Sequence, residues 1–331
     1  MTILVKYTLL LSLLSPLLVA QPSRDIEAYF SKTKGRYYKG GVDNIITKDI
    51  SEANSTINMA MYYLTNKNIT KALIKAHQRG VEVKIVTDDK NINSKRYKSL
   101  KHYGVVIRDD NDKKALMHNK ILIVDNHIVW IGSGNYTVYS FYRNSENFLK
   151  IRDNKIAEYY NKKFMTLYNN LDNISIEPYI DRELEIYFSK DSDIESRIIE
   201  LIRASKVEID IMMFAFTNRD IANELLRAKE RGVEVKIVID RTQNRYQRAN
   251  SIYNYLKLKG IDIELDRNRF KLHNKVMIID SNITIIGSYN YTKKANSIND
   301  ENILIIKDRE LTEKYIGEFK KIKSKDNPRE K

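Results

Sequence analysis

The chain contains no cysteine, and glycine and proline are scarce, with 11 and 4 residues among 331. Without cysteine, a disulfide scaffold, a cysteine-bound zinc site and thiol chemistry are all excluded. The low glycine and proline content excludes collagen-like and low-complexity chains, and an apolar fraction of 42% is too high for a disordered chain. The length therefore predicts one large domain or two of ordinary size.

Positive charge is in excess, because 57 lysine and arginine residues face 43 aspartate and glutamate residues, a formal net charge of +14. This excess favours an anionic partner, which means nucleic acid, an anionic membrane surface or a phosphorylated substrate. The chain is also rich in lysine, asparagine, isoleucine and tyrosine, a bias that the source alone can produce. The charge by itself therefore identifies no partner.

The N-terminus has the layout of a secretory signal peptide. Lys6 is followed by the uncharged, leucine-rich segment 7–20, and polar residues follow the small residue Ala20. The apolar run is short for a membrane span, which needs about 20 apolar residues, although an uncleaved membrane anchor is the alternative. We therefore expect residues 1–20 to be a signal peptide and the rest of the chain to be exported.

The rest of the sequence repeats itself once. RGVEVKIV stands at 79–86 and again, unchanged, at 231–238, and MHNKILIVD at 117–125 corresponds to LHNKVMIID at 272–280. Further pairs follow in the same order, and the offset of 152 to 158 residues is too long for a solenoid repeat. We predict two copies of one domain, at 21–168 and 184–331, joined by a linker at 169–183.

Each repeat alternates strand patterns with helix patterns. In the second repeat, 207–216 and 233–239 are typical of strands, whereas 194–204 and 218–231 are typical of helices. Alternation of this kind favours a sheet covered by helices on both faces. We therefore expect an α/β protein with two tandem α/β/α sandwich domains and mostly parallel sheets.

Two copies of one polar motif carry the candidate chemistry. Among five histidines, only His118 and His273 lie at equivalent positions of the two repeats. In each copy a lysine follows two residues later on the same predicted strand, so both side chains point to one face. Cations and hydrogen-bond donors suit phosphoryl oxygens, and two imidazoles can supply a nucleophile and a general acid. The repeated groups are His118, Lys120, Ser133 and Asn135, and then His273, Lys275, Ser288 and Asn290.

Four acidic residues also recur at equivalent positions. Asp125 and Asp280 end each motif where a turn begins, so they act either in the chemistry or simply as turn residues. Glu146 and Glu301 follow a polar segment, and they either accept a hydrogen bond from a catalytic imidazole or lie solvated at the surface.

With HNKILIVD before GSGN, and HNKVMIID before GSYN, the chain resembles the phospholipase D superfamily, whose signature is His-x-Lys-x4-Asp followed by Gly-Ser-x-Asn. Both copies keep the family spacing, and the resemblance covers nearly everything after residue 20. Each repeat is most similar to the compact members, the small bacterial endonucleases and mitochondrial cardiolipin hydrolase. The resemblance implies that the repeats face each other across a pseudo-two-fold axis and form one site, so that a monomer is active.

The resemblance also implies a two-step phosphodiester exchange that needs no metal or other cofactor. We expect His118 to attack phosphorus and form a phosphohistidine, and His273 to protonate the leaving alcohol and then activate water. The lysines and asparagines would hold phosphoryl oxygens with help from the serines, and the glutamates match the family's histidine-orienting position. The catalytic set is His118, Lys120, Asp125, His273, Lys275 and Asp280, and the phosphate-binding or orienting set is Ser133, Asn135, Glu146, Ser288, Asn290 and Glu301.

The sequence indicates the class of reaction more clearly than it indicates the substrate. For a nuclease, the net charge and basic-aromatic stretches beside each motif would grip a phosphate backbone and stack bases. For a phospholipase D or cardiolipin hydrolase, the same charges would dock on an anionic bilayer. The chain lacks long insertions for a lid, so we favour a nuclease acting on RNA or DNA; a non-catalytic nucleic-acid-binding module is the third alternative. The stretches contain Tyr136, Tyr139, Phe141, Tyr142, Arg143, Tyr291, Lys293 and Lys294.

Overall fold

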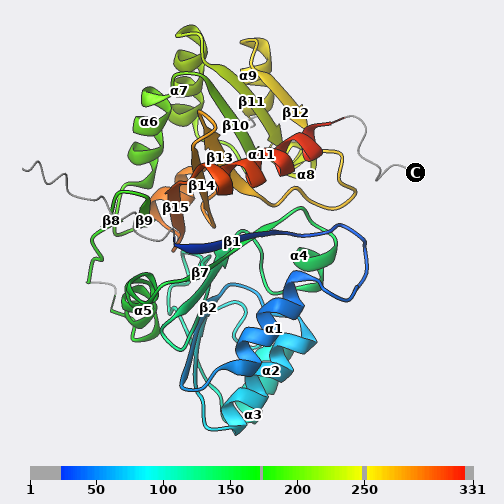
Figure 1. The fold of residues 1–331 in the computed structure, drawn as a ribbon, viewed down its shortest axis with the longest axis vertical. Coiled ribbons are helices and arrows are strands. Elements are labelled where there is room, and N and C mark those ends of the chain that lie inside the picture. The colour runs from blue at the N-terminus through cyan, green and yellow to red at the C-terminus, as the bar shows by residue number, and fades with distance from the viewer. Residues whose placement is uncertain (1–23, 172–173, 248–251, 325–331) are drawn as a thin grey trace, which may run out of the picture.

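The computed structural model describes residues 24–171, 174–247 and 252–324, and these residues form two sheets with helices around and between them (Figure 1). The predicted signal peptide at 1–20 lies outside the described residues, so export stays a prediction. Within the described part, no helix is both long and apolar enough to cross a membrane.

The first repeat builds one sheet, with the strand order β1-β7-β6-β5-β2-β3-β4. Its strands are β1 (Asp25–Phe30), β2 (Thr56–Met61), β3 (Glu82–Thr87), β4 (Val106–Asp109), β5 (Lys120–Val124), β6 (Ile128–Gly132) and β7 (Asn147–Arg152). Its helices are α1 (Val42–Glu52), α2 (Lys67–Gln78), α3 (Lys95–His102), α4 (Val138–Tyr142) and α5 (Asn154–Tyr168).

The second repeat builds the other sheet, in the order β12-β11-β10-β13-β14-β15-β9-β8. Its strands are β8 (Tyr179–Ile180), β9 (Leu184–Phe188), β10 (Glu208–Met213), β11 (Glu234–Ile239), β12 (Asp262–Leu265), β13 (Lys275–Ile279), β14 (Ile283–Gly287) and β15 (Asn302–Lys307). Its helices are α6 (Ile194–Ala204), α7 (Arg219–Glu230), α8 (Arg241–Gln247), α9 (Ile252–Leu258), α10 (Lys293–Ser297) and α11 (Arg309–Lys323). The short edge strand β8 lies inside the segment predicted as a linker.

The expectation of mostly parallel sheets is wrong, because both sheets are mixed. Neighbouring strands are parallel along β2-β3-β4 and along β10-β11-β12, where helices provide the crossovers. The strands β5, β6 and β7, like β13, β14 and β15, pair antiparallel. A hairpin turn reverses the chain between β5 and β6, and a parallel pair would need a much longer crossover.

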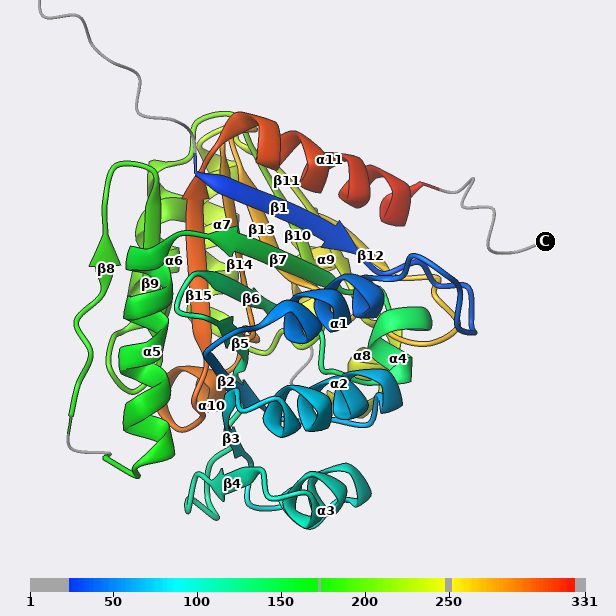
Figure 2. The ribbon, with the colours of Figure 1, turned by 60° about the horizontal axis from the view of Figure 1, so that its bottom comes forward.

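Apolar cores hold the layers of sheet and helix together, and Figure 2 shows how these layers are arranged. One core lies between the first sheet and the helices α1 to α3, and another lies between the second sheet and α6, α7 and α9. A further core lies between the sheets and combines side chains of both with those of α5 and α11. Because burial of this shared apolar surface drives association, the repeats are held face to face, and the starts of β5 and β13 come together.

Candidate active site

The two motifs lie where the chain enters β5 and β13. His118 and Lys120 point to one face of the first sheet, as the alternation of a strand requires, and His273 and Lys275 do the same in the second. The Lys275 Nζ donates a hydrogen bond of 2.5 Å to the backbone carbonyl of His273, and Lys120 bonds to the carbonyl of His118 in the same way. Each ammonium is therefore held beside its imidazole.

Each imidazole is held by a glutamate of the other repeat. The Nδ1 of His118 lies 2.8 Å from Oε2 of Glu301, and the Nδ1 of His273 lies 2.8 Å from Oε2 of Glu146. The predicted role of these glutamates as histidine partners fits this geometry, although the sequence did not indicate which repeat supplies which partner. Reciprocal contacts of this kind are what a pseudo-two-fold arrangement produces. With Nδ1 engaged, Nε2 is the ring nitrogen available to a substrate.

The serines of the motif position the glutamates. The Ser133 Oγ donates to Oε2 of Glu146 over 2.7 Å, and the Ser288 Oγ donates to Oε2 of Glu301 over 2.6 Å. A hydroxyl has only one proton to donate, so while these bonds hold, neither serine can donate to a phosphoryl oxygen. The serines therefore act as orienting residues, and phosphate binding falls to other groups.

Further polar residues, which were not predicted from the sequence, complete the support of each glutamate. The Oε1 of Glu146 accepts from Asn144 over 3.1 Å, and its backbone amide donates to the Ser31 Oγ over 2.8 Å. Asn299 and Ser189 make the equivalent bonds to Glu301. The two serines stand in YFSK segments repeated at 29–32 and 187–190, so the repeat contained the signal.

Asparagines behind the histidines connect the repeats a second time. Asn119 points away from the motif face, and its Oδ1 accepts from the Nδ2 of Asn302 over 2.6 Å. On the other side, the Nδ2 of Asn274 donates to the Oδ1 of Asn147 over 3.3 Å. All four side chains are fully buried. These bonds hold the start of β5 against β15 and the start of β13 against β7.

The motif glycines bring these strands into close contact. Gly132 and Gly287 adopt φ values of +146° and +152°, a region that glycine enters without the steric cost borne by other residues. A Cβ atom would lie 2.3 Å from the carbonyl oxygen of Asn147 at the first position and 2.1 Å from that of Asn302 at the second. A side chain here would push the glutamate-bearing strand away from the site.

Burial shifts the pKa of every ionisable group in the site. It lowers the pKa of His118, and it lowers that of His273 to about 4, with the adjacent glutamate opposing the change in each case. For Glu146, burial raises the pKa, but the hydrogen bond and charge of His273 outweigh it and bring the pKa to about 2. The free site therefore holds neutral imidazoles against ionised carboxylates.

The two lysines are also perturbed by burial. Lys120 and Lys275 are almost completely buried, and desolvation of the ammonium lowers the pKa of each to about 7, although the site glutamates oppose the shift. A bound phosphodiester would restore the positive charge on each lysine, because a negative charge nearby favours the ammonium form. The site is therefore built for an anion.

Aromatic rings and asparagines line the rim. The Tyr62 ring lies 5.3 Å from the His118 ring, and the Phe214 ring lies 4.5 Å from the His273 ring. Asn135 and Asn290 are half-buried beside these elements; the Oδ1 of Asn290 accepts from the backbone amide of Ala215 over 3.3 Å. The amide Nδ2 groups are the donors that these asparagines can offer to a substrate.

Asp125 and Asp280 do not lie with the other candidate residues, so their predicted catalytic role needs correction. Each follows the far end of its motif strand, β5 or β13. The Asp125 carboxylate accepts from the backbone amides of residues 54–56 at 2.8 to 3.0 Å, and Asp280 accepts from those of residues 206–208. Both aspartates adopt positive φ at the turn. They tie the hairpin to the start of the neighbouring strand.

The expected base-stacking surface is also mostly absent among the described residues, since its aromatic side chains are buried in packing. Tyr136, Phe141, Tyr142 and Tyr291 are at most 2% exposed. Tyr139 is the exception, with 54% of its surface exposed. Aromatic rings in a short segment after a strand pack into a core as readily as they line a groove, so the sequence pattern did not separate the two.

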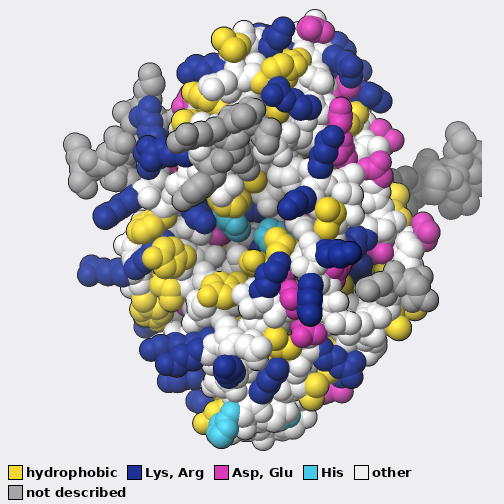
Figure 3. Space-filling model, turned by 180° about the vertical axis from the view of Figure 1, so that it is seen from behind, with side chains coloured by type: hydrophobic (Ala, Val, Ile, Leu, Met, Phe, Trp, Pro, Cys, Tyr) yellow, Lys and Arg dark blue, Asp and Glu magenta, His cyan; other side chains and the backbone are white. Residues whose placement is uncertain are grey.

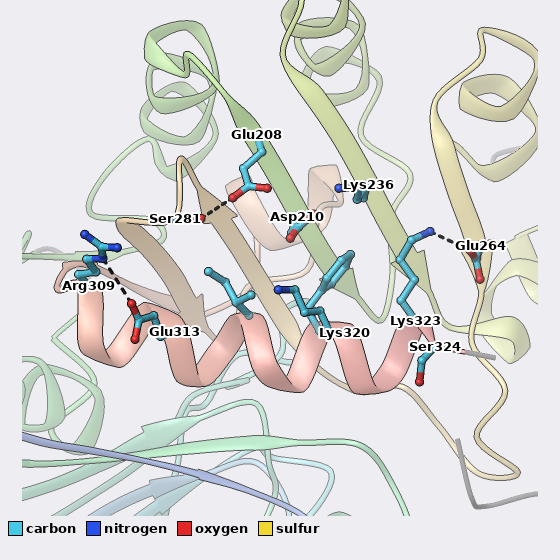
Figure 4. A pocket seen from close by; sticks show the side chains of 12 residues that line it. Glu208, Asp210, Lys236, Glu264, Ser281, Arg309, Glu313, Lys320, Lys323 and Ser324 are labelled. Carbon is cyan, nitrogen blue, oxygen red and sulfur yellow. Dashed lines mark hydrogen bonds and ion pairs between the residues drawn. The ribbon is translucent and has the colours of Figure 1, made fainter. Parts of the chain in front are cut away.

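The histidines are reached from one face of the molecule. Figure 3 shows histidine side chains in a hollow near the centre of this face, with lysine and arginine side chains around it. His118 and His273 are each 8% exposed. A separate cavity of about 700 Å³ lies between α11 and the second sheet, lined by residues such as Asp210 and Lys320 (Figure 4). None of the residues that line this cavity belongs to the candidate site, so the cavity takes no part in this chemistry.

The family follows from a comparison with known protein families. The family described as "Cardiolipin synthase, PLD-like domain" matches the chain twice, over residues 46–168 and 198–323. These ranges cover more than half of the sequence, and the chain therefore belongs to the phospholipase D superfamily, with its domain in tandem. The resemblance inferred from the two motifs is confirmed.

Individual relatives match shorter parts. The protein named Phospholipase D of Rickettsia conorii is 40% identical over 113 residues, which are 34% of this chain and 56% of that protein. The mitochondrial cardiolipin hydrolase of Homo sapiens is 31% identical over 134 residues, 40% of this chain and 52% of that protein. The match thus spans about half the length of these relatives. Phosphatidylserine synthase of Haemophilus influenzae shares the fold, with a TM-score of 0.67 at 14% identity, over 90% of this chain and 86% of that one.

Proposed function

We propose that this chain hydrolyses phosphodiester bonds of phospholipids through a phosphohistidine intermediate. The observation that carries the proposal is the reciprocal pair of imidazoles, each held at Nδ1 by a buried glutamate of the other repeat and flanked by a buried lysine. Such a site offers two Nε2 atoms and two cations to one phosphate group, which is what a two-step exchange at phosphorus requires.

In the first step, Nε2 of His118 attacks phosphorus, and the bond from phosphorus to the leaving alcohol breaks. His273 takes up a proton at Nε2 when the anionic phosphodiester binds, because a nearby negative charge favours the imidazolium form. It then gives this proton to the departing oxygen, while Lys120 and Lys275 balance the charge on the phosphoryl oxygens. In the second step, the now neutral His273 takes a proton from water, and the hydroxide displaces His118 from phosphorus. The products are an alcohol and a phosphate monoester, and both histidines return to their starting states.

Phospholipid is the substrate that the comparisons favour over nucleic acid. The relatives from Rickettsia conorii and Homo sapiens, at 40% and 31% identity, carry the names phospholipase D and cardiolipin hydrolase. Burial of most aromatic residues in the motif-flanking stretches removes the main argument for base stacking. The net charge of +14 suits an anionic bilayer as well as it suits a polynucleotide.

Nucleic acid is the second candidate, and one observation favours it. Tyr139 is exposed, and the Arg143 guanidinium lies 4.4 Å from the centre of its ring and 5.3 Å from that of Phe270. An exposed ring with a stacked guanidinium is a platform on which a base can stack.

Rates of cleavage distinguish the two candidates. The purified protein would be incubated in EDTA with vesicles of phosphatidylcholine or cardiolipin, and separately with labelled single-stranded RNA, single-stranded DNA and duplex DNA. We expect lipid cleavage by the wild type, none by His118→Ala or His273→Ala, and full activity from the exposed control His102→Ala. Cleavage of nucleic acid alone would overturn the proposal of a lipid substrate. Binding without turnover in every assay would overturn the proposal that the chain is an enzyme.

A monomer suffices for this function, because both motifs and both glutamates come from one chain. Size-exclusion chromatography with light scattering, run at the enzyme concentration of the assay, tests this point. Loss of activity on dilution into a monomeric state would contradict it.

A further inference from the structure

A cluster of three carboxylates lies beside the entry to the first motif. Asp88 and Asp89 follow β3, and Asp110 follows β4. One carboxylate oxygen of each lies within 4.8 Å of those of the other two. Asp88 is fully buried and Asp110 is 5% exposed, whereas Asp89 is half-buried and leaves the cluster open to solvent.

Hydrogen bonds satisfy only part of this cluster. Asp88 accepts from the backbone amides of Lys90 and Met117, and the Oδ1 of Asp110 accepts from the amide of Asp89 over 3.0 Å. Within the described part of the chain, the Oδ2 of Asp110 and the Oδ1 of Asp89 are buried without a hydrogen-bond partner. A buried carboxylate oxygen with no partner is costly, and a cation bound between these two oxygens would offset that cost.

The second repeat offers an internal comparison. Asp240 and Asp266 occupy the positions of Asp88 and Asp110, and they make the equivalent bonds: Leu272 donates to Asp240 over 2.9 Å, and the Arg241 amide donates to Asp266 over 2.9 Å. The residue at the position of Asp89 is Arg241. Burial raises the pKa of Asp266 to about 6, and the charge of Arg241 opposes this shift. One repeat thus carries its own cation where the other has a third carboxylate.

We propose that Asp88, Asp89 and Asp110 bind a divalent cation of the Ca²⁺ or Mg²⁺ class, with water completing its coordination. Ligands that are all carboxylate oxygens suit these hard cations, whereas zinc sites in proteins use mainly histidine and cysteine. The Met117 amide bonded to Asp88 precedes His118, so the cation braces the segment that leads into the motif. It takes no part in the reaction itself, because none of its ligands belongs to the histidine, lysine and glutamate set.

Thermal unfolding and calorimetric titration of the full chain test the site. After treatment with EDTA and desalting, addition of CaCl₂ or MgCl₂ at a hundredfold excess over the dissociation constant should raise the Tm by about 4 °C. Titration should give one bound cation per chain. Asp89→Arg copies the second repeat and should abolish both the shift and the titration heat, with a Tm in EDTA no lower than that of the wild type.

Asp110→Asn provides a second variant of nearly the same shape, and it should also lose the cation response. Glu310→Gln, at the exposed start of α11, removes one carboxylate elsewhere and should respond like the wild type. Absence of a Tm shift with either cation in the wild type, or an unchanged shift in Asp89→Arg or Asp110→Asn, would overturn the site. These readouts do not depend on turnover, so a failure here leaves the proposed phosphodiesterase function untouched.

Discussion

Glu301→Gln removes the charge that faces His118 while keeping an oxygen that can still accept from Nδ1. Attack on phosphorus through Nε2 makes the His118 ring cationic, and the buried Glu301 carboxylate lies 2.8 Å from its Nδ1. At a charge separation of about 4 Å and an effective dielectric of about 20, that attraction is about 4 kcal/mol. Since about 1.4 kcal/mol corresponds to a tenfold change in rate, formation of the phosphohistidine should slow by up to about 10³-fold.

Glu146→Gln should act on the other histidine and therefore on the other step. His273 is needed to protonate an alkyl alcohol but not a p-nitrophenolate, which leaves as the anion. With a p-nitrophenyl phosphodiester, this variant should form phosphohistidine at nearly the normal rate and hydrolyse it slowly, because His273 still has to activate water. Rapid quenching followed by peptide mass spectrometry should then find phosphate on His118.

The two variants make the reciprocal assignment refutable. Glu301→Gln should accumulate no intermediate with the same substrate, and Glu158→Gln, an exposed glutamate on α5, should behave like the wild type. Phosphate on His273 in the Glu146→Gln variant, or accumulation in Glu301→Gln, would show that the roles or the pairings are reversed.

Three further predictions concern pH, stability and backbone contact. The kcat/KM should fall as pH rises through about 7, because burial lowers the pKa of Lys120 and Lys275 to about 7 and the ammonium forms hold phosphate; a profile that is flat to pH 9 would contradict this. Asp125→Ala should lower the unfolding free energy in urea by about 2 kcal/mol without changing kcat. Burial opposes ionisation of Asp125, but amide bonds from residues 54–56 lower its pKa overall, so this stability should be present above pH 4 and fade as pH falls through the lower folded pKa. Gly132→Ala should lower both Tm and turnover, since its Cβ would lie 2.3 Å from the Asn147 carbonyl oxygen; a fully active, equally stable variant would disprove that the close approach matters.

The repeated motif was sufficient to predict which residues form the pairs of imidazole and ammonium. Strand alternation places His118 and Lys120 on one face whatever the rest of the fold does. The partner of each histidine could not be predicted in the same way, because a duplicated sequence is unchanged when the copies are exchanged. Glu146 is an equally good partner for either histidine until the packing of the two sheets against each other is known.

Sheet direction and aromatic burial escaped prediction for different reasons. Alternation of helices and strands accounted for β2, β3 and β4, but the hairpin of β5 and β6 reverses the chain and makes each sheet mixed. The sequence pattern of the aromatic residues after β6 is compatible both with burial in the core and with exposure to solvent. Tyr136 and Phe141 fill the core, whereas Tyr139 faces solvent, and only the path of the short helix α4 decides between them.

The reciprocal contacts between imidazole and carboxylate have an evolutionary consequence. The partners His118 and Glu301 are 183 residues apart in sequence, and His273 and Glu146 are 127 apart. A change to the glutamate of one copy therefore affects the histidine of the other copy. Selection on the active site thus acts on both copies together. Among tandem relatives, positions 118 and 301 should vary together, as should 146 and 273, while the histidine and glutamate of one copy (118 with 146, 273 with 301) should not. Duplication has produced two copies that can diverge at their surfaces but must change in concert at their centre.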